Sequence, residues 1–227
     1  MHPVRTLLIT WLMLPSAALA WGPMGHEIIC EIAWRESSQS VRGEITKLLQ
    51  GDRYRTFPRA CYWADRVLRN DSYAWSAPHH YLNVDVASDD IDLARDCPVT
   101  GRGCVLRAID INQAILTDDA EPFARRREAL KFLGHFVGDV HQPLHVSHRR
   151  DRGGNTIAVT FFGKSSNLHR VWDSGLISRA ERIDAHTLAT RIRSHISEVN
   201  RKAWISDTPR DWGEESYDLA RTVAYRS

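Results

Sequence analysis

Histidine and aspartate recur at metal-binding spacings in the middle of this chain. His135 and Asp139 are four residues apart, and so are His169 and Asp173. On a helix this separation stacks two side chains on one face, where they can hold one ion. His145 follows a proline, which ends a regular helix and can redirect the chain. The spacing therefore predicts metal binding by imidazole and carboxylate ligands.

The N-terminal region offers a further, unusual ligand. Residues 1–20 contain one positive charge, then an apolar stretch over 7–14, and end in Ala-Leu-Ala. This pattern predicts a signal peptide that is too short to span a membrane. Cleavage after Ala20 would free the α-amine of Trp21, which can chelate a metal together with its own carbonyl oxygen. His26 is close enough in sequence to supply a third ligand.

Each histidine–aspartate pair also has a purely structural explanation. His135 could be a core histidine hydrogen-bonded to Asp139, and His169 with Asp173 could be an exposed helix pair worth a few tenths of a kcal/mol. Taken alone, either pair leaves this alternative open. However, Asp139 lies in an apolar run, where a buried carboxylate must be neutralised by a partner or a metal. Two pairs combined with His145 and a chelating N-terminus favour the metal.

Imidazole and carboxylate ligands without thiolate suit zinc in an open catalytic site. Several such ions close together suit phosphoester hydrolysis. One pair polarises the phosphoryl oxygens and makes hydroxide at moderate pH, while another ion takes the charge that develops on the leaving oxygen. A dedicated general acid is then unnecessary.

Composition limits the alternatives. The chain has 227 residues and a formal net charge of +2. Residues 21–227 suffice for one domain with a sizeable core and are too few for two comfortable domains. The small charge disfavours a protein that holds duplex nucleic acid by phosphate contacts alone. Four cysteines lie in the exported part, where disulfides persist, and no second apolar run could span a membrane.

Periodicity predicts a mainly α domain with one small β-hairpin. Residues 153–155 form a turn and 156–162 alternate as one arm of the hairpin, while 72–92 are irregular. Apolar residues at helical spacing predict the helices 26–37, 41–49, 56–70, 105–117, 125–140, 168–180, 184–199 and 212–225.

From Trp21 almost to its last residue, the chain resembles the trinuclear-zinc single-strand nucleases of the S-one/P-one family. The resemblance implies the helical fold shared with phospholipase C. The motifs that carry it are W-G-x-x-G-H at 21–26, W-A-D at 63–65, W-S-A-P-H-H-Y at 75–81, H-F-V-G-D-V-H-Q-P-L-H at 135–145, G-G-N at 153–155 and N-L-H-R-V-W-D at 167–173.

The resemblance implies three zinc ions and a role for each matching residue. One zinc would be held by Asp65, His80, His135 and Asp139, a second by His145, His169 and Asp173, and a third by the Trp21 amine and carbonyl with His26 and the bridging Asp139. Asp65 would also orient the attacking hydroxide. Tyr81 would stack on the base beside the scissile phosphate, with Asn83 beside it in the substrate site.

The implied activity is hydrolysis of single-stranded DNA and RNA to 5′-phosphorylated products, with 3′-nucleotidase activity. A base that stacks on Tyr81 needs an exposed face, which duplex DNA does not offer, and stacking tolerates any sequence. The resemblance further implies disulfides Cys30–Cys61 and Cys97–Cys104. We expect a monomer that is secreted or periplasmic.

The chain departs from the family pattern at a few positions. Leu68 stands where members commonly carry an arginine that can stabilise transition-state charge, with Arg66 and Arg69 nearby. Asn83 stands where fungal members carry an aspartate that contacts the base. The chain stops at Ser227, before typical relatives end, so we expect that a final helix is missing and that apolar side chains of the last helices are left bare.

Two alternatives remain open from the sequence. A zinc phospholipase C-type phosphodiesterase would share the fold and a tryptophan amine ligand, although Tyr81 and the motif spacing favour bases. A non-catalytic secreted zinc-binding protein is compatible with Leu68 and the early chain end.

Overall fold

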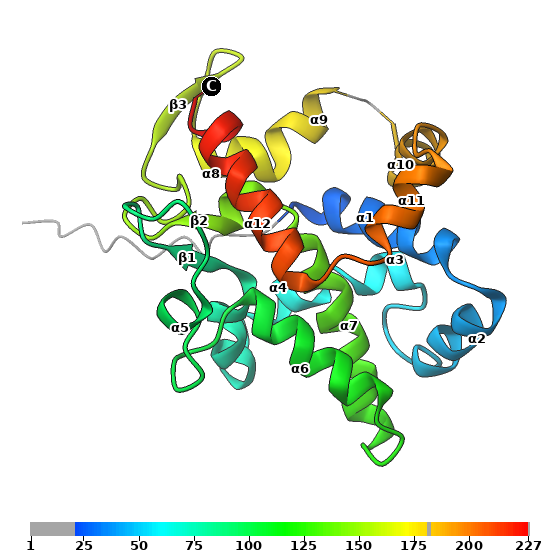
Figure 1. Cartoon of the computed structure of the whole chain (residues 1–227). Coiled ribbons are helices and arrows are strands. Elements are labelled where there is room, and N and C mark those ends of the chain that lie inside the picture. The colour runs from blue at the N-terminus through cyan, green and yellow to red at the C-terminus, as the bar shows by residue number, and fades with distance from the viewer. Residues whose placement is uncertain (1–20, 181–182, 227) are drawn as a thin grey trace, which may run out of the picture.

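The structure is a computed structural model that describes residues 21–180 and 183–226 (Figure 1). The predicted signal peptide, residues 1–20, lies outside the described residues. The prediction of a mainly helical fold is confirmed. The helices are α1 (Pro23–Glu36), α2 (Gln39–Leu48), α3 (Phe57–Ala60), α4 (Trp63–Val67), α5 (Leu93–Asp96), α6 (Val105–Thr117), α7 (Phe123–Val140), α8 (Leu168–Arg170), α9 (Leu176–Ala180), α10 (Ala185–Ser194), α11 (Glu198–Trp204) and α12 (Pro209–Leu219).

Helix α7 is the central element. It lies alongside α6 in Figure 1, and α1, α4 and α12 also pack against it. Phe132, Phe136 and Val140 of α7 join Val105 and Ile109 of α6 in the largest hydrophobic cluster. The C-terminal half of α7 also buries His135 and Asp139. The helix that organises the core therefore also carries two of the predicted ligands.

Two small sheets complete the fold. Strands β3 (Ala158–Phe161) and β4 (Lys164–Asn167) pair antiparallel, which confirms the predicted hairpin. Strands β1 (Leu82–Val84) and β2 (Val146–His148) pair parallel, with Leu82 opposite Val146. This second sheet was not predicted, because each strand has only three residues and its partner lies far along the chain.

Several predicted helices are interrupted, each for a local reason. Residues 56–70 form α3 and α4 separately, because the Cys61 carbonyl accepts a hydrogen bond from His135 and does not serve a continuous helix. The prediction of one helix over 184–199 was also wrong: Ser197 caps a new helix, α11, by accepting a hydrogen bond from the Asn200 N–H.

Other elements differ from the prediction in type or in regularity. The 72–92 segment was predicted to be irregular, but it contains β1 and most of a 3-10 helix, η1 (Asp71–His80). Residues 168–180 are helical with a π-helical turn, η3 (Val171–Gly175), between α8 and α9. A second π-helical turn, η4 (Ala220–Ala224), follows α12, and a short 3-10 turn, η2 (Pro143–His145), follows α7.

Two disulfides form as predicted, Cys30–Cys61 and Cys97–Cys104. The first ties α1 to the segment between α3 and α4, and the second closes a local loop before α6. Among residues 21–180 and 183–226, no helix is both long and apolar enough to cross a membrane. On the last helices, Ile192, Leu219 and Val223 are exposed, whereas Leu188 and Ile196 are half-buried. The expectation of a missing final helix stays a prediction.

We predict that the two disulfides stabilise the protein unequally. Cys30–Cys61 spans 31 residues and Cys97–Cys104 spans 7. In the chain-entropy model the longer loop contributes about 3.7 kcal/mol and the shorter about 2.4 kcal/mol. Urea unfolding in zinc buffer should therefore show a larger loss of unfolding free energy for the double Cys30→Ala/Cys61→Ala variant than for Cys97→Ala/Cys104→Ala. An equal or reversed order would contradict the prediction.

Candidate metal centre

All of the side-chain ligands predicted from the sequence are buried, and they come from elements far apart in the chain. Each of them is at most 5% exposed. Among the described residues, three groups have ligand atoms that all lie within 4.8 Å of one another. The groups are His26, Asp65 and His135; His80, His135 and Asp139; and His145, His169 and Asp173. The fold therefore gathers the predicted residues into one continuous cluster.

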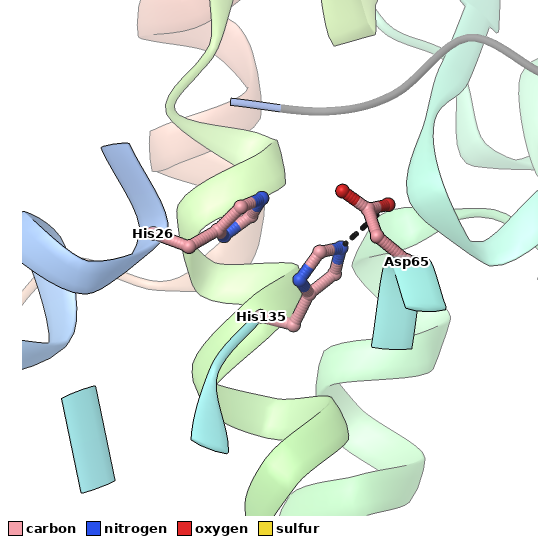
Figure 2. Close-up of side chains that lie close together, drawn as sticks. All are labelled: His26, Asp65 and His135. Atoms are coloured by element: carbon pink, nitrogen blue, oxygen red, sulfur yellow. Dashed lines mark ion pairs between the residues drawn. The ribbon is translucent and has the colours of Figure 1, made fainter. Parts of the chain in front are cut away.

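The first part of the cluster surrounds Asp139 and Asp65. Asp139 Oδ2 lies 3.0 Å from His80 Nδ1 and 3.2 Å from His135 Nε2. Asp65 Oδ1 lies 3.4 Å from His135 Nε2 and 3.7 Å from His80 Nδ1. Figure 2 shows His135 of α7 and Asp65 of α4 directed toward each other, with His26 of α1 beside them. Donor atoms of all four predicted ligands of one zinc thus converge.

The second oxygen of Asp139 faces a different set of imidazoles. Asp139 Oδ1 lies 3.5 Å from His26 Nε2 and 3.9 Å from His145 Nδ1. A carboxylate whose two oxygens face two different donor sets has the geometry to bridge two cations. His145 Nδ1 is engaged with the His80 carbonyl, so His26 is the ligand that this oxygen faces. The bridging role of Asp139 stays a prediction.

His145, His169 and Asp173 form the remaining group. Asp173 Oδ2 lies 3.2 Å from His169 Nε2, and Asp173 Oδ1 lies 3.8 Å from His145 Nε2. The imidazoles of His145 and His169 stack with their centroids 5.0 Å apart. Asp173 lies on the π-helical turn, so its neighbourhood departs from the regular helix that was assumed for this pair.

Backbone carbonyls orient three of the imidazoles. His135 Nδ1 lies 2.7 Å from the Cys61 carbonyl oxygen. His145 Nδ1 lies 2.6 Å from the His80 carbonyl oxygen, and His169 Nδ1 lies 2.6 Å from that of Gly153. Because a carbonyl can only accept, each Nδ1 carries a proton and each Nε2 is the ring nitrogen that faces the cluster. Protein metal sites use this second hydrogen bond to fix the tautomer and orientation of a histidine ligand.

The small sheet and a glycine make these contacts possible. Strand β2 begins directly after His145, and β1 begins two residues after His80, so their pairing brings the two histidines together. Gly153 has a φ of +64°, and a Cβ there would lie 2.3 Å from the Leu144 carbonyl oxygen. The G-G-N motif thus supplies a backbone position at which only glycine fits against its neighbour.

Gln142 is a site residue that the sequence analysis missed. Its side-chain amide donates to Asp173 Oδ1, and its own oxygen accepts the Leu144 N–H at 2.6 Å. Gln142 is fully buried. The signal was present in the sequence, because a glutamine enclosed by two histidines and a proline in an apolar region needs buried partners.

The cluster has the polar atoms that a bound cation would satisfy. Both ring nitrogens of His26, both carboxylate oxygens of Asp65 and of Asp139, and Nε2 of His145 are buried and make no hydrogen bond to any described residue. Groups of this kind are costly to bury without a partner. The donor set, imidazole nitrogen and carboxylate oxygen, is the one that suits zinc.

Burial and mutual charge shift the pKa values in the cluster. Burial and the neighbouring His135 lower the pKa of His26 to about 3, so His26 is neutral. Burial lowers the pKa of His135, but the Asp139 and Asp65 carboxylates outweigh it and raise the value to about 10. Burial raises the pKa of Asp173 to about 9. An ionised Asp173 therefore needs positive charge beside it.

Trp21 lies against the same region through its backbone. The Gly22 N–H donates to the Asp173 carbonyl at 2.8 Å, which holds the start of the described chain beside that ligand. A Cβ on Gly22 would lie 2.3 Å from Ser174 Oγ, so a larger residue there would require this hydroxyl to rotate away. The Trp21 side chain is half-buried. Its role as a backbone ligand stays a prediction.

The predicted substrate residues open onto a cavity next to the cluster. Tyr81 follows His80 and is 37% exposed, and Asn83 lies on β1. Both line a cavity of about 650 Å³, together with Arg102, Arg149 and other residues. This cavity offers an exposed ring, an amide and guanidinium groups, and Tyr81 links it to the cluster as the chain neighbour of His80.

The structure also shows the surroundings of Leu68, which stands where family members commonly carry an arginine. Leu68 is half-buried at the end of α4, whereas Arg66 and Arg69 are exposed. Arg66 donates to the Tyr54 hydroxyl at 3.4 Å. Neither arginine makes a contact with the cluster among the hydrogen bonds and ion pairs of the described residues.

Comparison with known proteins finds a nuclease family model and relatives that are named nucleases or endonucleases. The S1/P1 nuclease family model matches residues 21–227. The chain is 37% identical over 191 residues to Endonuclease 2 of Arabidopsis thaliana, covering 80% of this chain and 64% of that protein. It is 32% identical over 172 residues to Nuclease S1 of Aspergillus oryzae, covering 74% of this chain and 58% of that protein. It is 29% identical over 222 residues to Nuclease P1 of Penicillium citrinum, covering 89% and 81%.

We predict that one extra residue in front of Trp21 removes most activity and lowers the zinc content. An amide nitrogen cannot replace the free amine as a ligand, whatever side chain precedes it. The measurement compares zinc per chain and turnover for proteins beginning at Trp21 and at one added residue. Full zinc content and activity in the extended protein would show that the amine is not a ligand.

We predict that Asp139→Asn loses more zinc than Asp173→Asn and abolishes turnover. Asp139 faces two donor sets and Asp173 faces one, so only the first substitution removes charge from two sites. Metal analysis of both variants after dialysis tests the division. Equal zinc loss in the two variants would contradict it.

Proposed function

We propose that this chain, which belongs to the S1/P1 nuclease family, is a secreted zinc-dependent endonuclease that acts on single-stranded DNA and RNA. Family membership makes it a nuclease, a phosphodiester hydrolase. The substrate form, the metal and the location are our inference. The observation that carries the proposal is the buried cluster around Asp139, which lies next to an exposed ring, Tyr81.

The proposed zinc ligands are those that the family resemblance implies, and their side chains lie in the buried cluster. Zinc supplies Lewis-acid polarisation of the phosphate and balances charge at the leaving oxygen. The three ligand sets are Asp65, His80, His135 and Asp139; His145, His169 and Asp173; and the Trp21 amine and carbonyl with His26 and Asp139.

Within this site the protein groups would position the reactants. The Asp65 carboxylate makes no hydrogen bond to a described residue, so it can accept one from the attacking water and orient it toward phosphorus. Gln142 holds the Asp173 carboxylate in place. Attack in line with the 3′ oxygen would leave the phosphate on the 5′ side, which gives 5′-phosphorylated products. The same attack on a terminal 3′-phosphate is a 3′-nucleotidase reaction.

Selection of single strands would follow from Tyr81. A base can stack on this ring only after it has left a duplex, and stacking is worth about 1–3 kcal/mol per base. The Asn83 amide, two residues further on, can bond to a base edge. Its donor and acceptor differ from the aspartate of fungal members, so the base preference would also differ.

Export would follow from the leader-like residues 1–20. The predicted cleavage after Ala20 would both release the protein and create the amine ligand. Two disulfides agree with an oxidising compartment. Processing and metal loading are thereby linked in this proposal.

The decisive experiment is digestion with and without chelator. Purified protein beginning at Trp21 is given single-stranded DNA, duplex DNA, RNA and phosphatidylcholine. We expect cleavage of the single strands, chelator sensitivity and 5′-phosphate ends. Hydrolysis of phosphatidylcholine in place of nucleic acid would identify a phospholipase C-type enzyme, and zinc binding without hydrolysis would identify a binding protein.

We also predict that Tyr81→Ala lowers kcat/KM on single-stranded DNA about tenfold or more, because a stacking surface worth about 1–3 kcal/mol is removed. Phe162→Ala is the matched control, since Phe162 is 65% exposed and does not line the cavity beside Tyr81. A Tyr81→Ala variant as active as Phe162→Ala would exclude stacking on this ring.

A further inference from the structure

A second groove, separate from the Tyr81 cavity, concentrates arginine. It has a volume of about 530 Å³. We call it the arginine groove and define it by Arg53, Arg55, Arg59 and Arg66 with Tyr54 and Tyr62. The groove and the Tyr81 cavity share no lining residue. The arginine groove is therefore a distinct surface.

The charge of the arginine groove is strongly positive for a chain of net charge +2. Glu27 is its one acidic lining residue, and the Glu27 carboxylate lies 3.9 Å from Arg59 Nε. The Arg59 side chain is nevertheless 75% exposed. Arg53 and Arg55 are exposed and form no ion pair within the described ranges. Their guanidinium groups are available to an anion.

The segment that carries Arg53 and Arg55 is anchored to the core. The Tyr54 N–H donates to Asp52 Oδ1 at 2.8 Å, and Asp52 Oδ2 pairs with the buried Lys131 at 3.0 Å. Tyr54 is half-buried and packs against two hydrophobic clusters. With Tyr54 turned inward, the arginines on either side of it remain exposed. The backbone that carries the groove arginines is therefore fixed to the core by Asp52 and Tyr54.

The arginine groove reaches the metal cluster. The ring centroid of Tyr62 lies 6.4 Å from that of His26. Arg66 follows Asp65 directly on α4, and its guanidinium bonds to the Tyr54 hydroxyl. Tyr81, which lines the other cavity, directly follows the predicted ligand His80 in the chain. A polynucleotide at the cluster could therefore extend into either region.

We propose that the arginine groove binds the phosphates of a single-stranded polynucleotide beyond the nucleotide at the scissile bond. The inference rests on the proposed function of the metal cluster. Guanidinium forks bind phosphate oxygens in pairs. Tyr62, which also lines the groove, would offer a ring on which a base stacks without sequence preference. This groove extends the substrate site and makes long strands better substrates than short ones.

The test substitutes Arg53→Gln, Arg55→Gln and Arg59→Gln together. Binding of a labelled oligothymidylate is followed by fluorescence anisotropy across a salt titration, on a zinc-loaded Asp65→Asn background that slows cleavage. We expect Kd to rise about tenfold, and the slope of log K against log salt to fall by about 0.7 for each phosphate that the variant no longer neutralises. In the otherwise unsubstituted enzyme, the kcat/KM ratio of long oligothymidylate to thymidine dinucleotide should fall to a similar extent.

The matched control removes the same charge elsewhere, with Arg125→Gln, Arg210→Gln and Arg226→Gln, none of which lines the groove. If both triple variants change Kd and the salt slope equally, the effect is one of net charge and the proposal is wrong. If the Asp65→Asn background fails to fold, the length-dependent kcat/KM ratio decides. If the enzyme cleaves no single strand, the anisotropy arm still tests the groove, so the two failures are distinguishable.

Discussion

The rest of the structure depends on one constraint, the burial of the ionised Asp139 carboxylate at the apolar C-terminal end of α7. Asp139 is fully buried near the C-terminus of α7, beside Phe136 and Val140, which belong to the main core. Burial disfavours the charged form of Asp139, but the adjacent His135 holds its pKa well below the usual value. Because buried charges are tolerated only with partners, the neighbouring elements must deliver imidazoles to this point. The cluster is consequently part of the core, and if it holds zinc as we propose, loss of the metal would affect folding as well as chemistry.

The supports of the cluster come from backbone atoms more than from side chains. Carbonyls of Cys61, His80 and Gly153 hold the imidazoles of His135, His145 and His169. Each carbonyl belongs to an interruption of regular structure: the break between α3 and α4, the end of η1, and the turn before β3. A carbonyl inside a helix would already be used by the helix. The irregularities are therefore the means by which the fold frees acceptors at the site.

The same point explains what the sequence could predict. Helical periodicity and the four-residue spacing identified α6, α7 and the ligand pairs, since those signals are local. The prediction of single helices over 56–70 and 184–199 was wrong, because the Cys61 carbonyl contact and the Ser197 cap interrupt them. The β1–β2 pairing depends on contacts between distant segments, which no local pattern reveals. The sequence around Gln142 indicates a buried glutamine, but it does not reveal that its partner is Asp173. The positions of the ligands, by contrast, were accessible through the family resemblance.

Leu68 can be understood from the distribution of positive charge around the site. An arginine at that position would place a cation on α4 near Asp65, whereas here Leu68 is half-buried. Positive charge is instead found in two separate surfaces, the Tyr81 cavity and the arginine groove, which includes the exposed Arg66. In the proposed function, cations at these surfaces would lie along the substrate and not at the reacting phosphate, so they would act mainly on binding. Transition-state charge would then be balanced chiefly inside the buried cluster, which places a greater demand on complete metal loading than in a relative with an arginine at this position.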